Sequence, residues 1–221
     1  MLSADAIIAL HDQRTQDWHL SPGEAHCVGA EAGSASPAKH DGAGEVAADW
    51  LAAVARQHRA NFDLWHIEDE ARAPGATDAE LAAVKRRVDL TNQRRSDLAE
   101  ELDRALLAWL ATRSLPNPAA ELNSESPGLI VDRLSILALK MYHTREEAER
   151  ADAPPGHAER NRERLAILEE QRADLAGCLD ALWQETLHGT RRFKLYRQLK
   201  MYNDPSLNPS IYRRPLQSPD W

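Results

Sequence analysis

Residues 62–103 read FDLWHIEDEARAPGATDAELAAVKRRVDLTNQRRSDLAEELD, and residues 139–180 read LKMYHTREEAERADAPPGHAERNRERLAILEEQRADLAGCLD. Each stretch has a Pro-Gly turn between two segments with the apolar spacing of amphipathic helices, which is typical of an αα-hairpin. Set against each other 77 residues apart without a gap, the stretches match His66 with His143, Glu70 with Glu147, Arg87 with Arg164, and Arg95 with Arg172. The offset is eleven heptads, so a seven-residue packing pattern stays in phase between them.

The match has two interpretations, a true duplication or the shared Ala, Leu, Arg and Glu bias of any two amphipathic helices. We expect the duplication. It predicts an all-α protein, an antiparallel helical bundle built from two duplicated αα-hairpins plus an N-terminal helix and a C-terminal arm.

The rest of the chain supports the all-α class, because no stretch shows the alternation of strands. N-cap residues, prolines and glycines place helices at about 4–18, 45–72, 78–113, 127–150 and 157–188, with a further helical segment at 191–202. We expect one helical domain over residues 1–221, with a flexible loop at 21–44, an internal repeat at 61–103 and 138–180, and an extended tail at 203–221.

Charge and composition argue against several classes of protein. A net charge of -8 with 43% hydrophobic residues is ordinary for a soluble globular protein and unsuited to binding nucleic-acid phosphates. The apolar run 134–141 contains Ser135 and Lys140 and is far shorter than the ~20 residues of a membrane span. No secretion signal is evident, and Cys27 and Cys178 lie in unlike surroundings. We therefore expect no disulfide and a cytoplasmic location.

An arginine interrupts the apolar seam of the second helix in each hairpin. The seam of the first copy is Val84, Val88, Thr91, Arg95, Leu98, Leu102, Ala105 and Trp109, and the second copy repeats it 77 residues later, with Arg172 in place of Arg95. A buried arginine needs a carboxylate partner. The antiparallel neighbours offer Glu68, Asp69 and Glu70 to Arg95, and Glu146 and Glu147 to Arg172. We predict that both arginines are largely buried and paired.

These arginines also support a functional hypothesis. Together with Lys140 they would grip the phosphate or carboxylate of a ligand, since guanidinium groups bind such anions with two parallel bonds. Glu68, Asp69 or His66 would then act as a general base or metal ligand. The alternative is a polar layer that only fixes helix register.

Histidine and glutamate pairs are weak candidates for metal ligands. His66 with Glu70, and His143 with Glu147, are four residues apart and share a helix face. Two such pairs on facing helices, with Asp97 nearby, would form a metal site in a bundle core. The commoner interpretation is a surface ion pair or a histidine satisfied within the core.

The segment 193–208 is a basic, aromatic arm on an acidic chain. Such segments occur in nucleic-acid binders, but the acidity of the rest argues against that use. We expect the arm to close over residues 65–70, where Arg197 and Lys200 would meet carboxylates and Tyr196 would stack on Trp65.

Four motifs give the sequence a family resemblance. They are Leu64-Trp65-His66 with Glu68-Asp69 and Ala71-Arg72, Asn92-Gln93 with Arg95 and Asp97, the segment from Pro127 through Asp132-Arg133 to Leu137, and the segment from Lys194 to Pro209. Together they resemble the bacterial domain-of-unknown-function family 4254. That family has no established activity to transfer. Its members accompany glycosyltransferases of envelope glycan synthesis, which implies a partner role.

Two functions follow as expectations, without a named reaction, cofactor or oligomeric state. The first is binding of a small anionic metabolite, phosphorylated or sugar-linked, in a polar cluster. The second is a non-catalytic accessory role beside a glycosyltransferase-type enzyme. The candidate ligand-binding residues are Trp65, His66, Glu68, Asp69, Arg95, Asp97, Asp132, Arg133, Lys140, His143, Arg172, Tyr196, Arg197, Lys200 and Asn203.

Overall fold

A computed structural model of the chain describes residues 2–20, 42–201 and 204–209. The helices in these residues are α1 (Ala4–Leu20), α2 (Gly42–Glu70), α3 (Asp78–Ala111), α4 (Pro127–Glu149) and α5 (His157–Leu187), and the strands are β1 (Glu121–Leu122) and β2 (Arg191–Arg192). The predicted all-α class is confirmed. None of these helices is both long and apolar enough to cross a membrane.

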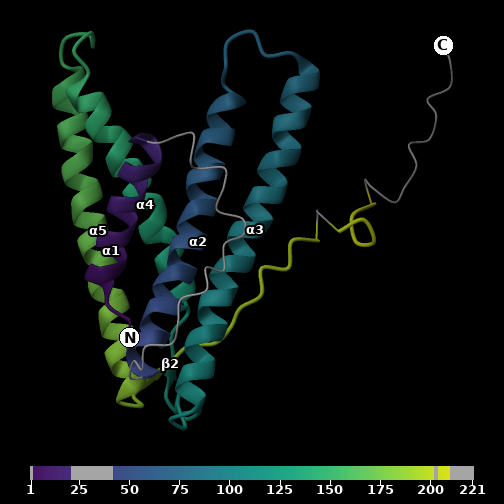
Figure 1. The fold of residues 1–221 in the computed structure, drawn as a ribbon, viewed down its shortest axis with the longest axis vertical. Helices are drawn as coiled ribbons and strands as arrows, with labels where there is room; N and C mark the ends of the chain where they lie inside the picture. The colour runs from purple at the N-terminus through teal and green to yellow at the C-terminus, as the bar shows by residue number, and fades with distance from the viewer. Residues whose placement is uncertain (1, 21–41, 202–203, 210–221) are drawn as a thin grey trace, which may run out of the picture.

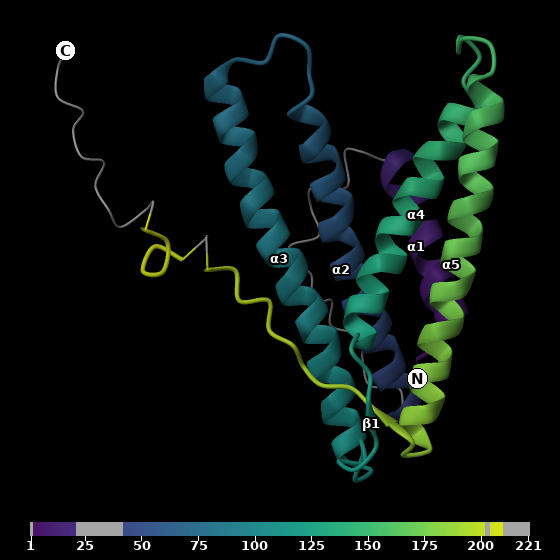
Figure 2. The same cartoon turned by 180° about the vertical axis from the view of Figure 1, so that it is seen from behind.

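The helices form two long hairpins, α2 with α3 and α4 with α5, as the Pro-Gly turns predict. The hairpins converge at one end and part toward their turns (Figures 1 and 2). Helix α1 packs against α2, α4 and α5. Three helices from the two hairpins therefore contact α1. The polar side chains of the candidate site lie at these contacts.

The hydrophobic core fills the convergent end of the bundle. Its fully buried members include Ile7 of α1, Val54 of α2, Leu106 of α3, Val131 of α4 and Leu179 of α5. Burying a side chain of this size stabilises the fold by about 1.5–3 kcal/mol. All five helices therefore share one hydrophobic core.

The apolar seams follow the predicted spacing in α5 but not along all of α3. In α5 the seam positions Leu175, Leu179 and Leu182 are buried. In α3 the buried stripe passes from Leu102 to Leu106 and Leu110 instead of Ala105 and Trp109. A straight helix has 3.6 residues per turn and drifts about 20° per heptad from a strict seven-residue repeat. The seam of α3 therefore shifts by one residue toward its end.

Two predicted N-caps behave differently. Thr77 closes a capping box with Glu80 at the start of α3, as expected. Ser126 precedes α4 but makes no cap hydrogen bond. Its hydroxyl donates to Asp103 of α3, which also accepts from the backbone N–H of Gly128 at 2.7 Å. The carboxylate of α3 therefore caps α4 in place of Ser126.

The predicted helix at 191–202 is wrong. Gly189 ends the preceding helix with a φ of +73°. The chain then pairs as β2 with β1 in parallel register, and Asn123 donates to the carbonyl of Arg192 at 2.8 Å. Backbone groups engaged in this way cannot make helical hydrogen bonds.

The described residues include parts of the predicted loop, internal repeat and tail. Residues 42–44 belong to α2, so the predicted loop ends earlier than residue 44, and residues 21–41 lie outside the described part. Of the predicted tail, residues 204–209 are described. The ranges 61–103 and 138–180 each span a helix-turn-helix unit. Their relation by duplication stays a prediction.

We predict opposite effects for two glycine substitutions. A Cβ at Gly128 would overlap the carbonyl oxygen of Ala99 and lie 2.9 Å from the carboxyl carbon of Asp103, whereas a Cβ at Gly177 of α5 meets nothing within 4 Å. Gly128→Ala should therefore lower the free energy of unfolding by about 1–3 kcal/mol through overpacking. Gly177→Ala should raise it by up to about 1 kcal/mol through helix propensity. Urea denaturation measures both, and a stabilised Gly128→Ala would contradict the close approach of α3 and α4.

Candidate functional site

A buried carboxylate, Asp132 of α4, joins the two hairpins. Arg95 of α3 donates to it through Nε at 2.8 Å and through Nη2 at 2.6 Å, which is the bidentate geometry of strong ion pairs. Two amides of α2, from Gln57 and Asn61, donate to the same oxygen, Oδ1. The pairing of Arg95 is as predicted, but its partner is not the expected Glu68, Asp69 or Glu70.

A chain of hydrogen bonds leads from this carboxylate to α1. Asn61 also donates to the hydroxyl of Ser135, which lies 2.7 Å from Nδ1 of His58, and Nε2 of His58 lies 2.9 Å from the hydroxyl of Thr15. With Ser135 donating to Nδ1, His58 carries its proton on Nε2 and donates to Thr15. Burial lowers the pKa of His58 to about 3, so the ring is neutral.

Arg172 of α5 is paired as predicted, again with an unexpected partner. It donates to both oxygens of Asp12 in α1 at 2.8 Å. The side chain of Arg172 is 17% exposed and that of Asp12 is 41% exposed, whereas Asp132 is only 9% exposed beside an Arg95 that is 27% exposed. The two matched arginines are therefore half-buried, and only Arg95 meets a buried acid.

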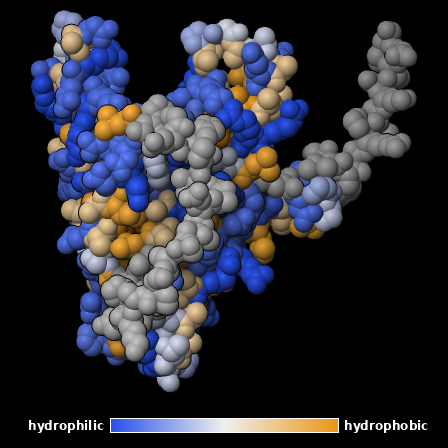
Figure 3. Space-filling view, in the orientation of Figure 1, coloured by the Kyte–Doolittle hydropathy of each residue, from blue (hydrophilic) through white to orange (hydrophobic). Residues whose placement is uncertain are grey.

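Trp65 of α2 lines two hollows. The space-filling view shows the notch between the parted ends of the two hairpins (Figure 3). The first hollow, about 450 Å³, is lined by Asn61, Leu64, Trp65, Glu68, Asp69, Arg72, Arg95, Ile136 and Leu139. The second, about 410 Å³, is lined by Trp65, Lys140, His143, Thr144, Glu147, Asn161, Arg164, Ile167, Leu168 and Gln171. Glu68, Asp69 and Arg95 thus converge in one cleft, as a ligand site requires.

The second hollow contains two cations, Lys140 and Arg164, that have no ion-pair partner among the described residues. Arg164 donates to the neutral side-chain oxygen of Asn161. Glu147 is already engaged by Arg150 and His157. An anion in this hollow would therefore meet two available cations.

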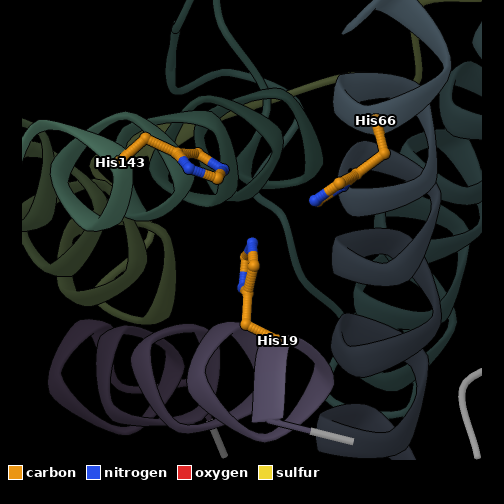
Figure 4. A group of neighbouring side chains, drawn as sticks. All are labelled: His19, His66 and His143. Atoms are coloured by element: carbon orange, nitrogen blue, oxygen red, sulfur yellow. The ribbon is translucent and has the colours of Figure 1, made fainter. Parts of the chain in front are cut away.

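Three histidines from three helices meet beside Trp65. His19 lies in the last turn of α1, His66 near the end of α2 and His143 in α4, and one ring nitrogen of each lies within 4.8 Å of the others (Figure 4). Trp65 stacks on His143 with ring centroids 4.9 Å apart, and Tyr142 stacks on His19 at 4.1 Å. Burial lowers the pKa of His19, and the neighbouring rings lower it further.

The glutamates expected to join these histidines are engaged by other partners. Glu70 pairs with Arg87 and Glu147 pairs with Arg150, so the predicted helix-face pairs do not form a metal site with them. Among the other candidates, Asp97 accepts from Gln93, and Arg133 pairs with Glu125. Neither lies on the two hollows beside Trp65.

The C-terminal arm lies along α3 and not over residues 65–70 (Figure 2). The backbone N–H of Gln198 donates to Glu100, and Lys200 donates to the carbonyl of Asn92. Burial lowers the pKa of Lys200, and the nearby charge of Arg95 lowers it further. Tyr196 is exposed, no ion pair of Arg197 occurs among the described residues, and Asn203 lies outside them.

Sequence reasoning missed His19, Gln57, Asn61 and Ser135. One signal was available, because polar residues recur at four-residue intervals on both helices. They are His11, Thr15 and His19 on α1, and Gln57 and Asn61 on α2. Such a spacing places each set on one helix face.

Arg95→Leu and Arg172→Leu form a matched pair of stability tests. Leucine at position 95 leaves Asp132 buried without its cation, so the free energy of unfolding should fall by about 3 kcal/mol. At position 172 the partner Asp12 is solvated, and the loss should stay below about 1 kcal/mol. Chemical denaturation distinguishes the two, and equal losses would show that burial of Asp132 does not decide the cost.

The buried histidines predict acid sensitivity. Burial lowers the pKa of His58 to about 3 and that of His11 well below its ordinary value of 6.5. The folded protein then binds fewer protons than the unfolded chain below pH 6.5, so its stability should fall by about 1.4 kcal/mol per pH unit per histidine. Burial raises the pKa of Asp103 to about 6. Protonation of Asp103 below about pH 6 therefore adds to the stability of the folded protein and opposes the effect of the histidines over a narrower range of pH.

Unfolding curves recorded between pH 7 and 5 measure this slope, which is the change in the free energy of unfolding per pH unit. His188→Ala should keep it, because His188 is exposed and bonds only to its own helix. His58→Gln should reduce it even if the variant is less stable at pH 7. A slope unchanged in His58→Gln would contradict the neutral, buried state of that ring.

Among the comparisons with known proteins, one family model matches the sequence. No curated protein and no solved structure matches the sequence. The matched region, residues 51–195, contains α3, α4 and α5, most of α2, and the residues that bind Asp132, while His19 precedes it. The family model that matches these residues is described as Protein of unknown function (DUF4254), and since it covers well over half of the sequence, the chain belongs to that family.

Proposed function

We propose that the protein binds a small anionic metabolite, phosphorylated or sugar-linked, in the cleft on the two sides of Trp65. The observation that carries the proposal is a pair of cations, on one side of this cleft, that have no ion-pair partner among the described residues. One hollow offers Lys140 and Arg164 to an anionic group. The other contains two carboxylates that can accept hydrogen bonds from hydroxyl groups, Asp69 and Glu68, of which Glu68 also pairs with Arg72.

Of the two roles considered for Arg95, its contacts favour the polar layer that fixes helix register. Its guanidinium is committed to Asp132 by two hydrogen bonds, so it positions the helices that line the first hollow. Arg172 lines neither hollow. The anion would therefore be held by Lys140 and Arg164, with Trp65 between the two hollows as an apolar wall for the body of the ligand.

The accessory role is the second candidate, and the C-terminal arm favours it. Leu199, Met201 and Leu207 are exposed apolar residues on a segment that few hydrogen bonds hold to α3. A partner enzyme would cover these side chains. In that role the cleft beside Trp65 would bind no metabolite.

A ligand panel tests the proposal. Inorganic phosphate, a neutral hexose, a hexose phosphate and a nucleotide sugar are compared by calorimetry and thermal shift. A ligand carrying both an anion and hydroxyl groups should bind tightest, and at 100 times its Kd it should add ~2.7 kcal/mol of stability. Lys140→Ala and Arg164→Ala should each weaken binding about ten-fold or more, since hydrogen bonds to charged groups contribute about 1.5–3 kcal/mol.

Arg86→Ala is the matched control, because Arg86 is an exposed arginine of α3 that lines neither hollow. It should bind like the wild type. Binding unchanged in Lys140→Ala and Arg164→Ala would place the ligand elsewhere. No binding by any member of the panel would favour the accessory role.

A further inference from the structure

The three histidines are arranged so that each ring presents a free lone pair to the same point. Nδ1 of each ring has an acceptor on its own helix: the carbonyl of Thr15 for His19 at 2.7 Å, the carbonyl of Phe62 for His66 at 2.9 Å, and the carboxylate of Glu146 for His143 at 2.8 Å. Acceptors of this kind require a proton on Nδ1. A neutral ring then keeps its lone pair on Nε2.

The Nε2 atoms face one another without a protein donor between them. Nε2 of His19 and Nε2 of His143 are buried and have no hydrogen-bond partner in the described residues. Figure 4 shows the outer nitrogens of the three rings turned toward a common centre. Leaving a buried acceptor unsatisfied costs about 1–3 kcal/mol. Two lone pairs cannot satisfy each other, so the cluster needs a hydrogen-bond donor or a cation at its centre.

A water molecule has two protons, so it donates to at most two of the three lone pairs. A metal cation accepts all three lone pairs at once. Metal-binding histidines almost always donate their other ring N–H to a backbone carbonyl or a carboxylate, which fixes the ring and its tautomer. All three rings here have such an acceptor at Nδ1.

We propose that His19, His66 and His143 form a site for one divalent transition-metal ion of the zinc type. Imidazole nitrogens suit zinc, copper, nickel and iron, and do not suit calcium or magnesium. Zinc with nitrogen ligands at about 2.0–2.1 Å places tetrahedral ligand atoms roughly 3.3 Å apart. The three nitrogens lie within 4.8 Å of one another. Small rotations of the half-buried rings would bring them to bonding distance.

Three protein ligands leave a fourth position for water or a ligand atom. The three side chains are half-buried, and the nitrogens of His19 and His143 that face the centre are buried. Trp65 stacks on His143 and also lines the two hollows, which places the metal site next to the proposed ligand cleft. The metal site stands on its own geometry and does not depend on a ligand in that cleft.

Metal titration of the tag-free, full-length chain tests the proposal. After chelator treatment, Zn²⁺ should bind with one equivalent per chain by calorimetry and elemental analysis. Co²⁺ should give the intense visible absorption of a tetrahedral site. Each of His19→Ala, His66→Ala and His143→Ala should weaken Zn²⁺ binding by more than about 100-fold, because loss of an outer partner alone costs 10–100-fold.

Two further variants sharpen the result. His188→Ala removes an exposed histidine outside the cluster and should keep full affinity. Glu146→Gln removes the charge behind His143 and should weaken binding about ten-fold without changing the stoichiometry. Circular dichroism of the metal-free variants checks folding.

X-ray absorption of the zinc-loaded wild type gives a readout that needs no variant. It should show three imidazole nitrogens and one oxygen ligand at about 2.0–2.1 Å. A shell with fewer imidazoles, or with sulfur, would overturn the proposal. So would absence of stoichiometric Zn²⁺ binding, or equal losses in His188→Ala and His66→Ala.

Discussion

The carboxylate of Asp132 is the point at which the helices of both hairpins are tied together. It accepts hydrogen bonds from Arg95 of α3 and from Gln57 and Asn61 of α2, while itself belonging to α4. A buried carboxylate is tolerated only when donors of this number surround it. The three helices must therefore keep one relative register. Apolar packing alone would allow several, since hydrophobic contacts are not directional.

The same network determines where α1 lies. Asn61 also binds Ser135, and through His58 the bonds reach Thr15 on α1. Thr15 and His19 lie one helical turn apart, so the network that holds Thr15 also brings His19 beside α2 and α4. The polar core thus positions the helices that carry the histidine cluster and the Trp65 cleft. His11 is also buried in that core, and neither of its ring nitrogens has a hydrogen-bond partner among the described residues.

Local patterns in the sequence predicted most of the fold and little of the site. Helix ends, the capping box at Thr77 and the need of Arg95 and Arg172 for carboxylates follow from neighbours in the chain or from the cost of a buried charge. The partners Asp132 and Asp12 do not, because they lie 37 and 160 residues away. His19 was missed for the same reason. Its relevance depends on how α1 packs, and that depends on the Thr15–His58 contact, which spans 43 residues.

The contacts between equivalent positions bear on the origin of the fold. His58 bonds to Ser135, and the ring of His66 lies 5.9 Å from that of His143; both pairs are 77 residues apart. Residues beside a two-fold axis contact their own equivalents, so an axis between α2 and α4 would account for both. The predicted duplication would match Asp132 with Ala55, which would leave Arg172 without a carboxylate on α2, and Arg172 pairs with Asp12 of α1. On this view α1 is the unrepeated element that breaks the symmetry, because it supplies both the missing acid and the third histidine of the cluster.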